Sequence, residues 1–135
     1  MIDIRTAPYA ALILRITLGI AFLAHAALKI FVFTPAGTAG FFESIGLPGA
    51  LAYLVIAAEV LGGIALIVGF QVRWVSLALI PILAGAIATV HGSAGFFFSN
   101  PNGGWEYPAF WIAALLAQAL LGNGALSVAP ATRAA

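Results

Sequence analysis

Apolar residues run through this chain in four long stretches that are separated by short polar or glycine-rich segments. The stretches cover residues 9–33, 49–70, 74–91 and 107–121. As helices they are compatible with a hydrocarbon core of roughly 30 Å, which about 20 residues can cross. Prolines and glycines between them favour breaks in the helices. The pattern predicts one all-α integral membrane domain over residues 1–135, folded as a four-transmembrane-helix bundle.

The composition also indicates a membrane protein. Hydrophobic residues make up 64% of the chain and charged residues only 7%, whereas roughly 25% of the residues in a soluble domain are charged. We therefore expect the lipid bilayer as the first partner of the chain. The net charge is +1 and no basic cluster is present, which argues against binding to nucleic acid.

The chain contains no cysteine. This excludes disulfides, thiol catalysis, thiolate-bound zinc and cysteine-ligated iron–sulfur clusters. We expect no metal site. Any redox chemistry would then use a bound organic cofactor, a haem or a partner protein.

The two longer connecting segments, residues 34–48 and 92–106, are expected to lie outside the membrane. The first predicts a short amphipathic helix capped by Thr38 and ended by Gly46, which either lies at the membrane surface or folds back as a re-entrant plug over the bundle. The second leads into an aromatic belt at the membrane surface, formed by Trp105, Tyr107 and Trp111. The tail beyond Gly124 is expected to be disordered.

The few charges outside the apolar stretches predict the orientation. Arg5, Arg73 and Arg133 fall in the two terminal segments and the middle loop, and Glu43 and Glu106 fall in the other two loops. Because cytoplasmic loops carry an excess of basic residues, both termini are predicted to be cytoplasmic.

Four side chains in the first two apolar stretches, three basic or histidine and one acidic, are candidates for a buried site. Arg15, His25 and Lys29 share a sector of roughly 80° on the first predicted helix. Glu59 lies in the middle of the second helix, too deep for its short side chain to reach water. A charge in the membrane interior needs a partner, and we predict that Glu59 pairs with Arg15.

Small residues predict where the helices touch. Gly62 and Gly63 lie beside Glu59, and Ala84, Gly85 and Ala88 form a stripe on the third predicted helix. Small side chains allow close helix contact in membranes, so both sets are expected to face another helix. Gln118 of the fourth helix is expected to form a hydrogen bond between helices.

Together the polar residues predict a column through the bundle, from Arg15 past Glu59 and His25 to Lys29 and His91. A structural interpretation exists for most of them. Arg15 and Lys29 could extend to the membrane surfaces, and each histidine could serve only as a hydrogen-bonding group. Glu59 is too short to extend to a membrane surface, so its carboxyl group must be paired or protonated at that depth.

Several motifs resemble those of the DoxX family of small four-helix bacterial membrane proteins. Residues 14–29 (LRITLGIAFLAHAALK) are similar to the family's L-R-x3-G-x2-F-L-x-H-G-x2-K pattern. Residues 58–63 (AEVLGG), 90–92 (VHG) and 103–108 (GGWEYP) match later family motifs in the same order. Ala26 departs from the glycine that usually follows the histidine.

The resemblance implies a four-helix bundle in the bacterial cytoplasmic (inner) membrane. It also implies a link to quinone-dependent oxidation of sulfur compounds or to redox-stress complexes.

The resemblance favours a membrane subunit of a quinone-linked oxidoreductase. In this hypothesis Glu59 and His25 exchange protons with a quinone, while Arg15 or Lys29 holds a quinone oxygen. The rest of the binding site would come from His91 and from the loop residues Trp105, Glu106 and Tyr107. No electron-carrier motif is present, so a partner protein would supply the electrons. The oligomeric state is left open. A haem between His25 and His91 is disfavoured, because the two lie at different heights.

Two alternatives from other functional classes stay open. The chain could be a non-catalytic scaffold or assembly factor for another protein, with a structural Arg15–Glu59 pair fixing the helix register. It could also be a small transporter that uses the polar column, although four helices are few for this unless the chain oligomerises.

Overall fold

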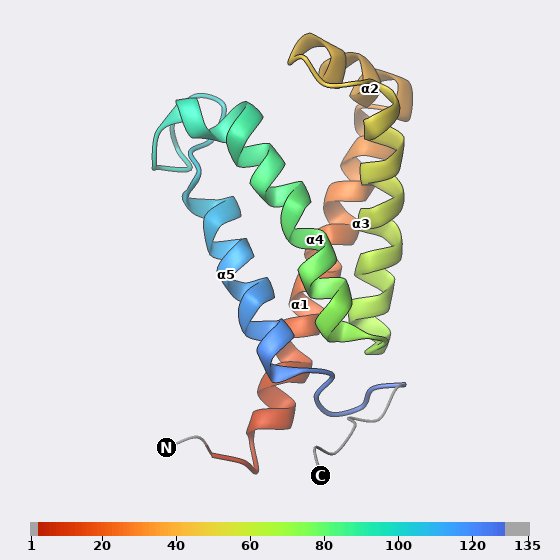
Figure 1. Cartoon of the computed structure of the whole chain (residues 1–135), viewed down its shortest axis with the longest axis vertical. Helices are drawn as coiled ribbons and strands as arrows, with labels where there is room; N and C mark the ends of the chain where they lie inside the picture. The colour runs from red at the N-terminus through yellow and green to blue at the C-terminus, as the bar shows by residue number, and fades with distance from the viewer. Residues whose placement is uncertain (1–2, 129–135) are drawn as a thin grey trace.

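The computed structural model describes residues 3–128, which form helices and connecting segments without any strand. The α-helices are α1 (Ala7–Ala27), α2 (Pro35–Ser44), α3 (Ala50–Val68), α4 (Val72–Ala86) and α5 (Glu106–Leu121). Figure 1 shows the four long helices converging near both ends of the chain and separating towards the opposite end, where α2 lies.

Each predicted apolar stretch lies largely within one of these helices. Three helical segments are long and apolar enough to cross a membrane, namely Ala7–Val32, Ala50–Val68 and Val72–Ala94. The fourth apolar helix, α5, has 16 residues and is therefore roughly 24 Å long, somewhat shorter than a hydrocarbon core. The protein is thus an all-helical, multi-pass membrane protein.

Two helices change their hydrogen-bonding pattern at the wide end of the molecule. α1 continues as a π-helix, η1 (Leu28–Val32), and α4 continues as a second π-helix, η2 (Ile87–His91), followed by the 3-10 turn η3 (Gly92–Ala94). π-helical turns are rare and often occur at functional sites. Here they contain Lys29 and His91, two of the predicted site residues.

The short helix α2 exists as predicted, but its cap is Thr34 and not Thr38. The hydroxyl of Thr34 accepts a hydrogen bond from the Gly37 amide at 3.1 Å, and Pro35 occupies the first turn. Thr38 is buried and donates to the carbonyls of Thr34 at 2.9 Å and Lys29 at 3.3 Å. Proline favours the first turn of a helix, so the helix begins earlier than predicted. Thr38 instead fastens α2 to η1.

Glycine allows α1 and α3 to touch through their backbones. A Cβ atom on Gly19 would lie 2.7 Å from the Gly63 carbonyl oxygen, and one on Gly63 would lie 2.9 Å from that of Gly19. On α3, Gly62 packs against Leu79 of α4. The prediction that small residues beside Glu59 face other helices is therefore confirmed.

The small-residue stripe of α4 has a different environment. Ala84, Gly85 and Ala88 are exposed, and a Cβ atom on Gly85 would meet no atom within 4 Å. The predicted helix contact at this stripe is wrong, because α3 and α4 have separated at this height (Figure 1).

Trp111 belongs to the hydrophobic core and not to a surface belt. It is 8% exposed, and its ring stacks on Phe22 with the ring centroids 4.8 Å apart. The prediction placed it with Trp105 and Tyr107, which are indeed exposed. Trp111 lies one helical turn further into α5, so its ring packs against α1 instead of the membrane surface.

Arg15 does not pair with Glu59, and this prediction is wrong. Its buried guanidinium group donates to four backbone carbonyls, those of Leu66, Ile67, Ala125 and Leu126. The last carbonyls of a helix have no partner within the helix and carry partial negative charge. The end of α3 therefore supplies acceptors to Arg15 at the narrow end, far along the helix from Glu59.

The segment after α5 is ordered as far as the structure describes it, contrary to prediction. The Ala125 amide donates a hydrogen bond to the Pro8 carbonyl, and the Val128 amide donates one to the Val68 carbonyl. These bonds close the narrow end of the bundle. The rest of the tail lies outside the described residues.

Gln118 donates to the Gly122 carbonyl at 2.8 Å, so the predicted interhelical hydrogen bond of this side chain is replaced by one to the end of its own helix.

Candidate functional site

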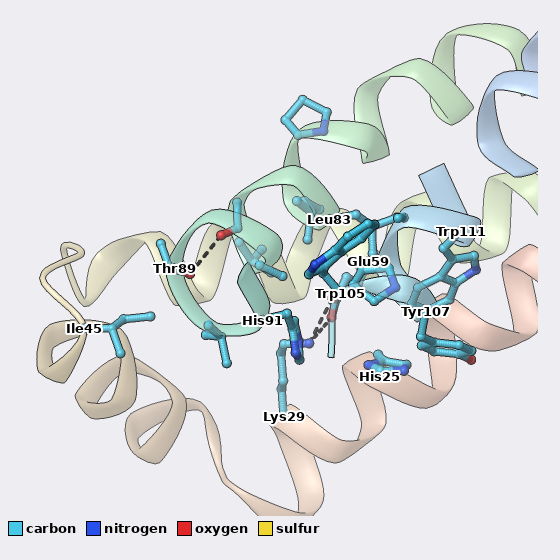
Figure 2. A pocket seen from close by; sticks show the side chains of 18 of the residues that line it. His25, Lys29, Ile45, Glu59, Leu83, Thr89, His91, Trp105, Tyr107 and Trp111 are labelled. Atoms are coloured by element: carbon cyan, nitrogen blue, oxygen red, sulfur yellow. Dashed lines mark hydrogen bonds and ion pairs between the residues drawn. The ribbon is translucent and has the colours of Figure 1, made fainter. Parts of the chain in front are cut away.

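A cavity of about 1520 Å³ opens between the helices at the wide end of the molecule. Residues from all five α-helices and from the loop before α5 line it. Most of its wall is apolar, with a few polar side chains that Figure 2 shows converging on the hollow. Ligand sites commonly combine an apolar wall with a small number of fixed polar groups.

The central polar feature of this cavity is an ion pair between Lys29 and Glu59. The Lys29 ammonium lies 2.9 Å from one carboxylate oxygen and 3.0 Å from the other (Figure 2). Glu59 is buried, while the Lys29 side chain keeps 19% of its surface accessible. Both residues were predicted for the site but not as a pair, because the long lysine side chain reaches back from η1 to the middle of α3.

His25 lies on the same wall as the ion pair, one helical turn before Lys29 (Figure 2). Its ring centroid is 5.0 Å from that of Trp111. Neither ring nitrogen of His25 has a hydrogen-bond partner among the described residues. The imidazole therefore has a donor and an acceptor left for a bound molecule.

His91 reaches the cavity from η2 on the opposite side. Its Nδ1 lies 2.7 Å from the Gly103 carbonyl oxygen and 3.1 Å from that of Asn102. Because carbonyl oxygens only accept hydrogen bonds, Nδ1 carries the proton. In the neutral ring Nε2 is then an acceptor, so the loop before α5 fixes both the tautomer and the position of this histidine.

The loop residues predicted for the site form the edge of the cavity. Glu106 accepts a hydrogen bond from the Phe98 amide at 2.7 Å, which holds the loop onto the start of α5. Trp105 packs edge-on against Phe96, with ring centroids 4.9 Å apart. Tyr107 contacts Trp111, with ring centroids 5.6 Å apart. An aromatic wall thus leads from the exposed loop to the core.

The structure brings together seven of the eight predicted site residues. His25, Lys29, Glu59, His91, Trp105, Glu106 and Tyr107 all line the large cavity, whereas Arg15 does not. Trp111 also lines the cavity but was not predicted for the site, because its sequence position suggested the membrane surface. A smaller hollow of about 430 Å³ lies beneath α2 and shares Lys29 and His25 with the large cavity.

Comparison with known proteins identifies the family. The DoxX family model matches residues 10–92, which include most of α1, the whole of α2 to α4 and both π-helical segments. The chain belongs to the DoxX family. The expectation from its motifs is thereby confirmed, and the match covers Lys29, Glu59 and the histidines of the cavity.

One curated relative is similar over most of its length. It is a protein of Bacillus subtilis (strain 168) named "Putative oxidoreductase CatD", 34% identical over 119 residues. The aligned region covers 88% of this chain and 84% of the relative. No solved structure matches the chain.

Proposed function

We propose that this DoxX protein is a membrane subunit of a quinone-linked oxidoreductase and that the large cavity binds the quinone. The observation that carries the proposal is the Lys29–Glu59 ion pair on the wall of an apolar cavity. Glu59 is the tenth of the 19 residues of α3, so it would lie near the middle of the bilayer. The family and the name of the relative from Bacillus subtilis support a redox role.

The residues of the cavity fit a quinone. Its flat ring needs an apolar or aromatic wall, which Trp111 and Tyr107 can provide. Its two oxygens need hydrogen-bond donors when oxidised and acceptors when reduced. Lys29 makes two contacts to Glu59 and has a third N–H to donate, and His25 can both donate and accept.

The chemistry of such a site would be divided between the quinone and the chain. When bound, a quinone accepts two electrons and two protons. Lys29 would hold one of its oxygens, while Glu59 and His25 would give or take protons at the oxygens. His91, with its proton fixed on Nδ1, would offer an acceptor from the opposite side of the cavity. We propose that a partner protein supplies the electrons at the aromatic loop.

We propose the bacterial cytoplasmic membrane as the location and a topology with both termini in the cytoplasm. This orientation follows from the distribution of basic residues. It would place the wide end of the cavity, with α2 and the aromatic loop, on the outer side.

The first test asks which small molecule accompanies the purified protein. We expect an organic extract of the wild type, isolated in mild detergent, to contain nearly stoichiometric quinone by mass spectrometry. Glu59→Gln removes the charge that holds Lys29 and should lower the bound quinone about tenfold. Glu43→Gln is the matched control, because Glu43 is exposed and lines neither hollow.

The same preparation separates the competing functions. An extract of the wild type that holds only lipid would contradict the proposal and favour a scaffold. A haem band in the reduced-minus-oxidised spectrum would replace it with a site between the two histidines. Unchanged quinone in Glu59→Gln would show that the ion pair is not part of the binding site.

A further inference from the structure

The cavity extends from the Lys29–Glu59 pair into an apolar slot between α3 and α4. The two helices touch where Gly62 packs against Leu79: a Cβ atom on Gly62 would lie 2.8 Å from that leucine side chain. From this contact towards the wide end, α3 and α4 diverge (Figure 1). The inner end of the slot therefore lies beside Glu59, which precedes Gly62 by one helical turn.

Both walls of the slot are apolar helix faces. Leu51, Leu54 and Ala58 follow one face of α3, and Ala78, Pro81 and Gly85 follow one face of α4. All six line the cavity. The spacing of three or four residues in each set places its members on a single side of the helix. The slot is thus a defined surface with no polar side chain from these positions.

The slot is open towards the surroundings of the helices. Leu54 is 65% exposed although it lines the cavity, and a Cβ atom on Gly85 would meet no atom within 4 Å. In a membrane this side of α3 and α4 faces hydrocarbon, not water. A molecule in the slot could therefore extend from the polar site of Lys29 and Glu59 directly into the lipid.

We infer that the slot between α3 and α4 holds the hydrocarbon chain of a membrane-soluble quinone whose ring lies at the Lys29–Glu59 pair. This inference rests on the proposed function and specifies its substrate class: a long-chain quinone that enters sideways from the bilayer. The smaller hollow beneath α2 also borders Lys29, but its volume of about 430 Å³ leaves less room for a long chain than the 1520 Å³ of the large cavity.

Gly85→Phe tests the inference by adding an aromatic ring to the wall of the slot, at a position where a Cβ atom would meet no neighbour within 4 Å. Gly40→Phe is the matched control: Gly40 is also helical, a Cβ atom on it would also meet no atom within 4 Å, and it lines neither hollow. Two ring-matched pairs of quinones serve as probes, menaquinone-4 with menadione and decylubiquinone with ubiquinone-0. Affinity can be measured by quenching of tryptophan fluorescence, since Trp111 lines the cavity.

We expect Gly85→Phe to weaken binding of the chain-bearing quinone by about tenfold and to leave the chain-free ring nearly unchanged. Gly40→Phe should change neither. Equal losses for both members of a pair would place the ring in the slot and overturn the inference, as would an unchanged affinity for the chain-bearing member. If the wild type binds neither member of either pair, the proposed function itself fails. Should Gly85→Phe not fold, Ala78→Phe on the same face of α4 is the second variant.

Discussion

At the scale of single residues, the main electrostatic feature is a neutral pair held away from water. Lys29 and Glu59 cancel each other's charge, and each oxygen of Glu59 contacts the ammonium group. Removing charged groups from water is costly, and the pair recovers this cost only while both partners are present. A ligand that took one of these two contacts would therefore disturb the balance of charge between Lys29 and Glu59.

Single and double substitutions of the pair separate stability from binding. We expect Lys29→Met to lower the free energy of unfolding by about 3 kcal/mol, because Glu59 is left buried without its partner. The double variant Lys29→Met/Glu59→Leu should regain most of this loss, since no unpaired charge remains. Thermal unfolding in detergent measures the stability, and quinone extraction measures the binding.

In the double variant we expect the thermal stability to recover and the bound quinone to stay low. A stable double variant without quinone would support a binding role for the pair. A stable double variant that retains quinone would reduce the pair to a structural element and contradict the proposed site.

The charges show how far residue chemistry can be predicted from the sequence. Glu59 was predicted to need a partner, and it has one. The choice of Arg15 failed because backbone carbonyls compete with carboxylates as acceptors, and hydropathy does not reveal them. The four carbonyls around Arg15 come from the end of α3 and from the segment after α5. Their convergence on one guanidinium group depends on a chain path that the sequence pattern does not specify.

At the scale of helices, the close contact between α1 and α3 and the separation of α3 from α4 together form the cavity. The Gly19–Gly63 contact brings the backbones of α1 and α3 together and helps to set the distance that lets Lys29 reach Glu59. The small residues predicted a helix contact at Gly62 and Gly63, without naming its partner, and another at Gly85. Only the first is real, because small side chains permit close packing but do not require it. The two π-helical turns could not be predicted at all, since they leave no clear trace in hydropathy.

Two glycine substitutions of the same kind should have opposite effects. Alanine favours helices over glycine by up to about 1 kcal/mol, so Gly40→Ala, where the added carbon meets no neighbour, should raise the melting temperature. Gly19→Ala places its carbon 2.7 Å from the Gly63 carbonyl oxygen. Overpacking costs about 1–3 kcal/mol, so this variant should be less stable than the wild type. A rise in stability for Gly19→Ala would show that the backbone contact is not tight.

At the scale of the whole molecule, the bundle is closed at one end and open at the other. Arg15 and the segment after α5 tie the narrow end together, whereas α2 and the loop before α5 surround a cavity at the wide end. The fold class and the helices followed from hydropathy. The cavity did not, because it arises from the divergence of α3 and α4. Because the cavity lies at the wide end, the orientation of the chain decides which membrane surface is nearer to the buried pair.

The orientation can be tested directly, because the natural chain has no cysteine and each introduced thiol is the sole target of a maleimide. We expect Ser99→Cys, in the exposed loop before α5, to react in intact cells with a reagent that cannot cross the membrane. Thr6→Cys, at the exposed start of α1, should react only after the cells are made permeable. Labelling measured by a gel shift distinguishes the two positions. The reverse pattern would place the wide end of the cavity in the cytoplasm, and the proposed electron-supplying partner would then have to be sought there.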